Sequence, residues 1–130
     1  MLHHSLTEKI IGVFYDVYND LGHGFLESVY EAAMVIALRD KGIVVAQQVE
    51  IPVWFRGQQI GTFFADLVVE GLVIIELKAV RSIDPAHEAQ LLHYLRATEI
   101  ELGLLLNFGV RPEIKHKTYD NPRKTSVQSV

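Results

Sequence analysis

The stretch Val73-Ile74-Ile75-Glu76-Leu77-Lys78-Ala79-Val80 has the aliphatic composition of a strand in the centre of a β-sheet. Only Glu76 and Lys78 interrupt it, and because alternate residues of a strand share a face, both charges lie on one face. Burying a carboxylate or an ammonium group without a partner costs several kcal/mol. The two charges therefore indicate either a functional site or an ion pair on an exposed patch of that face.

Another charge interrupts the apolar stretch that precedes this strand. Asp66 is the only charged residue within residues 63–69, although aspartate is a poor strand former. If the three-residue loop Glu70-Gly71-Leu72 joins the two strands, the antiparallel register places Asp66 opposite Glu76 on the same face. A two-residue loop would instead pair Asp66 with Ile75 and turn it to the opposite face.

Two facing carboxylates point to a metal site, because they repel each other unless a cation lies between them. An oxygen-lined site with open positions suits Mg²⁺, with Mn²⁺ as a substitute. The loop length is therefore a structural test of this site, since only the three-residue loop brings the two acids together.

The pattern around these two strands predicts one mixed α/β domain. Apolar residues recur either at helical spacing or in strand-like runs. The expected helices span about residues 5–21, 25–41 and 85–97, and the expected strands about residues 43–55, 60–69, 73–80 and 102–108. This order is ααβββαβ. Three strands form an antiparallel meander, and the last strand is buried on both faces and parallel to its neighbour in a right-handed βαβ unit.

Local signals set the boundaries of the elements and of the domain. Ser5-Leu6-Thr7-Glu8 has the form of a capping box, and Asp84-Pro85 places a capping carboxylate before a first-turn proline. The segment 111–119 is a candidate edge strand. We therefore expect a single domain over residues 1–119 and a flexible tail over residues 120–130.

Composition narrows the class of protein. The 130 residues are 49% apolar and 22% charged, which is typical of a folded soluble protein. No stretch approaches the run of about 20 apolar residues that a spanning helix needs, and the N-terminal residues lack the pattern of a secretory signal. We therefore expect a cytoplasmic protein with no membrane partner. The chain has no cysteine, which excludes disulfides, thiolate catalysis, iron–sulfur clusters and cysteine zinc sites.

Charge is unevenly distributed along the chain. Residues 1–108 carry seven Lys or Arg against fourteen Asp or Glu, whereas residues 109–130 carry five against two, which gives the net charge of −4. The negative charge of residues 1–108 argues against extensive contacts with the phosphates of nucleic acid. The basic C-terminal segment is either an ordinary solvated terminus or an arm that contacts phosphate.

Two of the predicted helices add polar candidates. Gln90 and Tyr94 lie one turn apart on the third helix, and Glu27 lies in the first turn of the second. Two of these also have an ordinary structural explanation, since Tyr94 could fill the core and Glu27 could favour the helix dipole. We expect His87 and His93 to be solvated or hydrogen-bonded, and not to be metal ligands.

Several of these residues match a known family in identity and in order. Asp66, the triplet Glu76-Leu77-Lys78, and Gln90 with Tyr94 resemble the PD-(D/E)XK nuclease superfamily in its RecB-like branch, whose helix carries a Gln-x-x-x-Tyr motif. The stretch from Gly24 to Tyr30 is similar to the signature of the GxxExxY family, a small bacterial family of that superfamily. The resemblance covers about residues 5–119. It implies a restriction-endonuclease-like α/β fold, a mixed β-sheet flanked by helices.

The resemblance also implies a metal site. Asp66 and Glu76 would bind Mg²⁺ with the help of the Leu77 carbonyl, and Glu27 would complete or orient the acidic site. One position departs from the family pattern, because Ala65 stands where a proline often precedes the first acid. The superfamily tolerates this change, so the assignment of Asp66 is unaffected.

Catalytic roles follow from the same resemblance. Lys78 would orient or activate the water that hydrolyses a phosphodiester, alongside the catalytic acids Asp66 and Glu76. Gln90 and Tyr94 would position substrate or water from the helix behind the site.

Three hypotheses about function follow from the sequence. The first is a Mg²⁺-dependent deoxyribonuclease in repair, recombination or defence, which acts on DNA and gains basic surface as a homodimer. The second is a non-catalytic module for nucleic acid or protein, in which Glu76 and Lys78 form an ion pair and no metal binds. The third is an antitoxin-like or scaffold protein. The acids and the lysine favour the first, and only the first makes the protein an enzyme.

Overall fold

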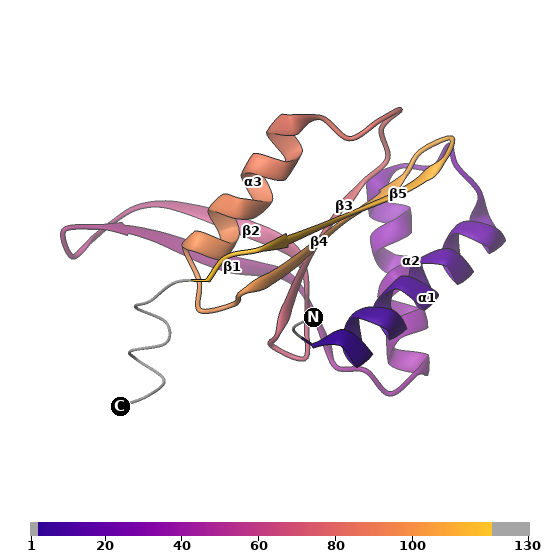
Figure 1. Ribbon diagram of the computed structural model, residues 1–130, viewed down its shortest axis with the longest axis horizontal. Coiled ribbons are helices and arrows are strands. Elements are labelled where there is room, and N and C mark those ends of the chain that lie inside the picture. The colour runs from indigo at the N-terminus through magenta and orange to yellow at the C-terminus, as the bar shows by residue number, and fades with distance from the viewer. Residues whose placement is uncertain (1–2, 121–130) are drawn as a thin grey trace.

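The computed structural model describes residues 3–120 and contains a mixed β-sheet with helices on both faces (Figure 1). The elements follow the chain in the order α1 (His4–Leu21), α2 (Glu27–Asp40), β1 (Val45–Phe55), β2 (Gln58–Val69), β3 (Val73–Lys78), α3 (Pro85–Arg96), β4 (Leu102–Phe108) and β5 (Pro112–Thr118). The predicted α/β fold and the ααβββαβ order are confirmed, and the candidate edge strand is formed as β5. The predicted tail lies outside the described residues, except for Asp120.

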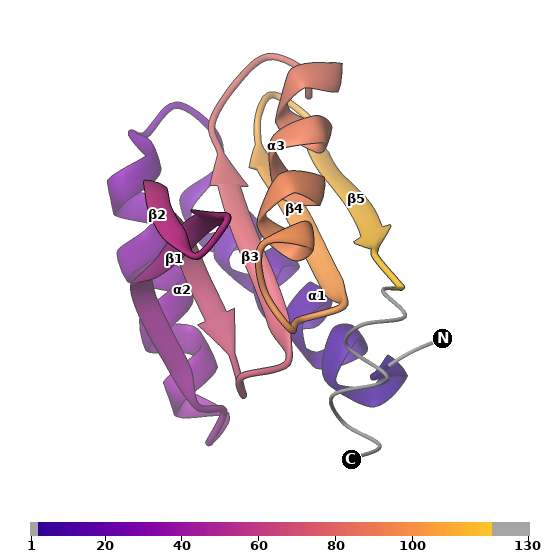
Figure 2. The ribbon, with the colours of Figure 1, turned by 90° about the vertical axis from the view of Figure 1, so that its left-hand side faces the viewer.

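The five strands lie in the sheet in the order of the sequence, β1-β2-β3-β4-β5. Strands β3 and β4 are parallel, as predicted, and the other neighbours are antiparallel. Figure 2 shows α3 in front of the sheet and α1 and α2 behind it. No helix within residues 3–120 is long and apolar enough to cross a membrane.

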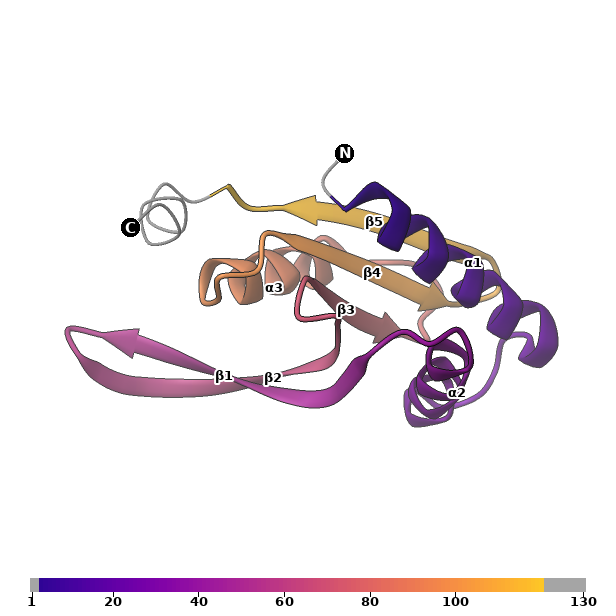
Figure 3. The same ribbon diagram turned by 90° about the horizontal axis from the view of Figure 1, so that it is seen from below.

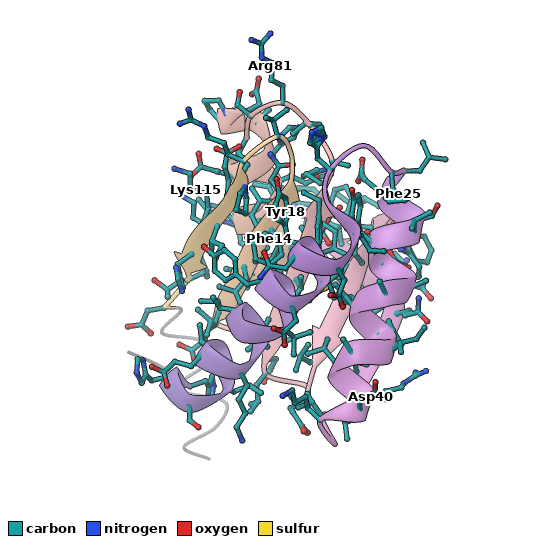
Figure 4. The ribbon with its side chains drawn as sticks, turned by 90° about the vertical axis from the view of Figure 1, so that its right-hand side faces the viewer. Phe14, Tyr18, Phe25, Asp40, Arg81 and Lys115 are labelled. Carbon is teal, nitrogen blue, oxygen red and sulfur yellow. The ribbon has the colours of Figure 1, made fainter. Side chains whose placement is uncertain are left out.

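An aromatic cluster forms the centre of the core between the sheet and the helices α1 and α2. The rings of Tyr30 and Phe108 stack with their centroids 4.1 Å apart, and Phe14 meets Phe108 edge-on at 4.8 Å. Figure 4 shows Phe14 and Tyr18 on the side of α1 that faces the strands. The Tyr18 hydroxyl donates a hydrogen bond to the carbonyl of Gly109, just beyond β4 (2.7 Å). This face of the sheet is closed by packed rings.

Tyr30 also holds the loop that joins α1 to α2. Its hydroxyl donates to the carbonyl of Gly22 (2.6 Å) and accepts from the N–H of Phe25 (3.2 Å). Gly24 has a φ of +108°, a conformation that residues with a Cβ rarely adopt. Both the glycine and the tyrosine of the Gly24–Tyr30 motif therefore have structural roles.

A smaller core lies between the sheet and α3. Leu91 and Leu95 of α3 pack against Ile74 and Leu105. Gly103 permits this close packing, because a Cβ at that position would lie 2.7 Å from the Leu91 side chain.

The ends of the helices partly follow the sequence signals. At α3, the Asp84 carboxylate accepts from the N–H of Ala86 (2.8 Å) and the Asp84 N–H donates to His87 Nδ1 (3.0 Å), so the predicted cap is confirmed. The capping box predicted at Ser5 is wrong. Helix α1 already begins at His4, and the Thr7 hydroxyl donates back to the His3 carbonyl, which places Ser5 inside the first turn.

The outer part of the β1–β2 hairpin, residues 49–65, leaves the sheet, and we call it the hairpin arm (Figure 3). Its strands stay paired up to a two-residue turn, Arg56-Gly57, in which both residues have positive φ. The strands also change face. Val45 and Leu67 pack in the core of α1 and α2, whereas Ile51 and Ala65 pack in the core of α3. The arm therefore crosses to the α3 side where Asp66 stands.

Candidate functional site

The loop between β2 and β3 has the length that the metal-site hypothesis requires. Val69 pairs with Val73 across residues 70–72, and the antiparallel ladder continues to the pair Leu67 and Ile75. The next two residues in this register are Asp66 and Glu76. The three-residue loop is confirmed, and the two carboxylates face each other.

The side chains of Asp66 and Glu76 accept backbone hydrogen bonds where the β2–β3 ladder ends. The N–H of Asp66 donates to Glu76 Oε2 (2.7 Å), and the N–H of Leu77 donates to Asp66 Oδ2 (2.8 Å). As the hairpin arm departs, it takes away the carbonyl partners of these backbone groups, and the carboxylates satisfy them instead. Each carboxylate uses one oxygen for these bonds, and Asp66 Oδ1 also lies 3.4 Å from Gln48 Nε2, so Glu76 Oε1 is the oxygen that none of these contacts occupies.

Glu76 is held in an electrostatically unfavourable position. Its side chain is only 4% exposed. Burial, and after it the neighbouring charge of Asp66, raises the pKa of Glu76 to about 8, although the Asp66 N–H and the charge of Lys78 act in the opposite direction. A cation beside the pair would lower this pKa and favour the ionised form. The two carboxylates are hard oxygen donors, so they fit Mg²⁺ or Mn²⁺.

A third acid that the sequence analysis missed lies next to this pair. Glu31, one turn after Glu27 in α2, accepts hydrogen bonds from Gln47 Nε2 (3.1 Å) and Gln48 Nε2 (2.8 Å). Gln48 Nε2 also reaches Asp66 Oδ1 at 3.4 Å. The charge of Glu31 contributes to the raised pKa of Glu76. The two glutamines interrupt the apolar pattern of β1, and that interruption was the available signal.

The predicted helix acid, Glu27, is the first residue of α2 and its side chain is exposed. It shares a helix face with Glu31, four residues later. Within residues 3–120, no three acidic or histidine side chains gather closely enough to form a ready-made metal cage. The carboxylates that the structure brings together are therefore Asp66 and Glu76, with Glu31 linked to them through Gln48.

Lys78 ends β3 two residues after Glu76, and its side chain is half-buried. The ion pairs among residues 3–120 join His4 to Glu8 and Lys117 to Glu88, and none joins Lys78 to Glu76. The ion pair expected for a non-catalytic module is therefore not formed. The charge of Lys78 nevertheless lowers the pKa of Glu76, as expected of an ammonium group nearby.

A second residue missed in the sequence holds the chain beyond Lys78. Asn107 is fully buried in β4, and its side-chain amide donates to the carbonyl of Val80 and accepts from the Val80 N–H, both at 2.9 Å. The same amide donates to Glu113 Oε1 (2.9 Å), which also accepts from the N–H of Ile83. Asn107 is the only polar side chain in its strand, so a buried hydrogen-bonding role was readable there.

Tyr94 approaches the site from α3. Its side chain is 4% exposed, and burial, followed by the charges of Glu76 and Asp66, raises its pKa to about 12. The hydroxyl is therefore a neutral donor beside the two acids. Gln90 lies one turn earlier on the helix and is partly exposed. His87 accepts from the Asp84 N–H at the start of the helix, and His93 is exposed.

Comparisons with known proteins agree with this geometry. A family model described as the PD-(D/E)XK nuclease superfamily matches residues 4–118. A solved structure, the crystal structure of SSO0001, is similar with a TM-score of 0.57 and 20% identity, over 78% of this chain and 55% of that chain. This chain thus spans about half the length of that protein, and the likeness shows a common fold. No curated protein matches. The match to the family model covers nearly all the described residues, and the chain belongs to the PD-(D/E)XK nuclease superfamily.

Proposed function

We propose that this protein is a Mg²⁺-dependent deoxyribonuclease of the GxxExxY family and the RecB-like branch. The observation that carries the proposal is the facing pair Asp66 and Glu76. The strand register brings the two carboxylates together, and burial and the charge of Asp66 raise the pKa of Glu76. A buried, repelling pair of carboxylates costs free energy, which a bound cation would recover.

The metal ligands proposed are Asp66 and Glu76, with the Leu77 carbonyl. Glu31, and Glu27 one turn before it, would complete the negative charge around the ion or hold its water. Gln48 supports this arrangement because its amide contacts both Glu31 and Asp66. When bound, Mg²⁺ would lower the pKa of water and stabilise negative charge on the phosphate during hydrolysis.

The residues around the acids would carry the rest of the reaction. The Lys78 ammonium would orient the attacking water or favour its deprotonation. The Tyr94 hydroxyl is neutral at physiological pH, so it can donate a hydrogen bond to a phosphate oxygen or to the water, and Gln90 can do the same from the previous turn. Such preorganised donors favour the transition state because they need no rearrangement as charge develops.

Cleavage of labelled DNA tests this proposal. We expect single-stranded, branched or duplex substrates to be cut in the presence of Mg²⁺, with no activity in a chelator. Asp66→Asn keeps a side chain of the same shape and should abolish cleavage. Cleavage by Asp66→Asn at the wild-type rate, or in the chelator, would contradict the proposal.

The proposed function also suggests a biological setting. A role in repair, recombination or defence, a cytoplasmic location and a homodimer are consistent with a DNA-cleaving enzyme of this size. A dimer would place two sites on one substrate and combine the cationic surfaces of two acidic chains. Sedimentation with and without DNA tests the dimer.

A further inference from the structure

A pocket of about 420 Å³ lies between the hairpin arm and the C-terminal half of α3. Figure 1 shows the arm running past this end of the helix. The pocket is lined by Trp54 and Phe63 of the arm and by His93 and Arg96 of α3, together with small and aliphatic residues. Its volume is in the range of sites that hold small organic groups such as a nucleotide.

The aromatic rings of this pocket are open to solvent. Trp54 is 60% exposed and Phe63 is 39% exposed, although large aromatic side chains usually bury most of their surface. They are exposed because the arm has left the sheet and is covered by α3 on one side only. A cluster of exposed aromatic side chains beside a candidate active site is typical of a binding surface.

The pocket adjoins the acidic pair through two rings in contact. Phe63 packs against Tyr94 with ring centroids 5.3 Å apart. Tyr94 in turn lies close enough to Glu76 and Asp66 for their charges to raise its pKa. A ligand that occupies the pocket therefore lies beside the residues proposed to hold the metal.

The charges around the pocket suit a nucleotide. Arg96 lines it, and a guanidinium group both pairs with phosphate and stacks on flat rings. The protein as a whole has a net charge of −4, so it is poorly suited to hold an intact duplex through its phosphates alone. Stacking of bases on aromatic side chains supplies affinity for nucleic acid without many cationic contacts, and it requires bases that are not paired in a duplex.

We propose that this pocket binds an unpaired nucleobase, stacked on Trp54 and Phe63, with a phosphate of the same strand contacting Arg96. The strand would then continue past Tyr94 toward the metal proposed at Asp66 and Glu76. This inference rests on the proposed nuclease function and narrows its substrate to single-stranded or frayed nucleic acid.

Binding in the absence of metal tests the pocket independently of cleavage. Trp54 is the only tryptophan of the chain, so its fluorescence reports directly on the pocket. With a chelator present, a short single-stranded oligonucleotide should quench this fluorescence, and a blunt hairpin duplex of the same length should quench it much less. Equal quenching by the two, or none, would overturn the inference.

Variants on the arm separate stacking from general apolar contact. The anisotropy of a labelled single strand should show that Phe63→Ala and Phe63→Leu weaken binding by roughly tenfold, while Phe63→Tyr keeps it. Phe64→Ala is the matched control, because Phe64 is an exposed aromatic residue on the opposite face of the same strand. Unchanged binding by Phe63→Ala, or an equal loss with Phe64→Ala, would contradict the proposal.

Two further results distinguish this inference from the proposed function. With a chelator present, Asp66→Asn should bind the single strand as the wild type does, and with Mg²⁺ it should fail to cleave the strand. If the wild type binds the strand but never cleaves, the pocket assignment stands and the nuclease proposal fails. The rings could instead join two copies of the chain. Sedimentation would then show a dimer that does not bind the strand and that dissociates with Phe63→Ala, and the inference would be wrong.

Discussion

The two faces of the sheet use the same strands for opposite purposes. On one face, Ile75 and Leu77 of β3 are buried under α1 and α2. On the other face, the alternate residues Glu76 and Lys78 lie beside the hairpin arm and α3. The closed face is built from hydrocarbon and stacked rings, whereas the α3 face contains two close carboxylates, the hydroxyl of a mostly buried tyrosine and exposed aromatic side chains.

This difference shows how a small domain can be stable and still hold an unfavourable site. The closed face supplies packing that does not depend on the acids. The α3 face can therefore retain two repelling carboxylates and an arm that leaves the sheet. Substitutions on the closed face should therefore change mainly stability. Substitutions on the α3 face should change mainly metal binding, substrate binding and catalysis.

The largest effect is expected for Lys78→Ala. Loss of a group that orients or activates water should lower the rate of DNA cleavage by roughly a hundred- to ten-thousand-fold, while metal binding and thermal stability change little. Single-turnover cleavage and a thermal melt measure the two. Lys9→Ala, an exposed lysine on α1, is the control and should cleave as the wild type does. Cleavage by Lys78→Ala at the wild-type rate would refute its role.

The next effect concerns pH. The pKa of Glu76 is raised from 4.5 to about 8 in the folded protein, so folding favours its protonated form. The associated stability is fully present below about pH 4.5 and is lost as the pH rises to about 8, by a few kcal/mol in metal-free protein. Thermal melts in a chelator across this range measure the loss.

Glu76→Gln sharpens this test because it resembles the protonated side chain. The stability of the variant should not decrease between about pH 4.5 and pH 8, and at pH 8 the variant should be more stable than the wild type. A wild-type protein that is equally stable across the range would show that Glu76 is not held in an unfavourable position.

A smaller effect is expected on the closed face. Tyr30→Phe removes the hydroxyl that bonds Gly22 and Phe25, and it should lower the free energy of unfolding by about 1–2 kcal/mol. Because the phenyl ring still stacks on Phe108, metal binding should stay unchanged. Chemical denaturation and a metal titration check both statements. A loss of metal binding would show that the loop before α2 shapes the site directly.

The smallest effect is expected at the start of α3. Asp84→Ala removes the cap on Ala86 and should cost about 1 kcal/mol, measured by chemical denaturation. Asp84→Asn retains a capping oxygen and should recover most of this loss. If both variants lose equally, the charge of Asp84, and not its hydrogen bond, stabilises the helix.

Local rules predicted the acidic pair on one condition, which was the length of the loop between β2 and β3. The alternation of strand side chains and the three residues between Val69 and Val73 determine that Asp66 faces Glu76. The cap at Asp84 and the parallel pairing of β4 are equally local in origin. These features could be predicted because each depends on a short stretch of chain.

The features that escaped prediction depend on how distant segments meet. Glu31 lies near the acids because Gln47 and Gln48 hold it, which requires the packing of α2 against β1. The hairpin arm crosses from one core to the other at Gln48, whose φ of +47° is unusual for a residue with a side chain. No periodic pattern encodes that bend, so the pocket beside α3 could not be read from the sequence.

The central claim is that Asp66 and Glu76 form a metal site on the α3 face. Titration of Mn²⁺ followed by electron paramagnetic resonance tests it directly, because the signal of the hexaaquo ion decreases on binding and no substrate has to be guessed. We expect wild-type protein to bind Mn²⁺, Mg²⁺ to compete for the same site, and Asp66→Asn to lose binding. Wild-type protein that leaves the Mn²⁺ signal unchanged, or Asp66→Asn that binds as tightly as the wild type, would contradict it.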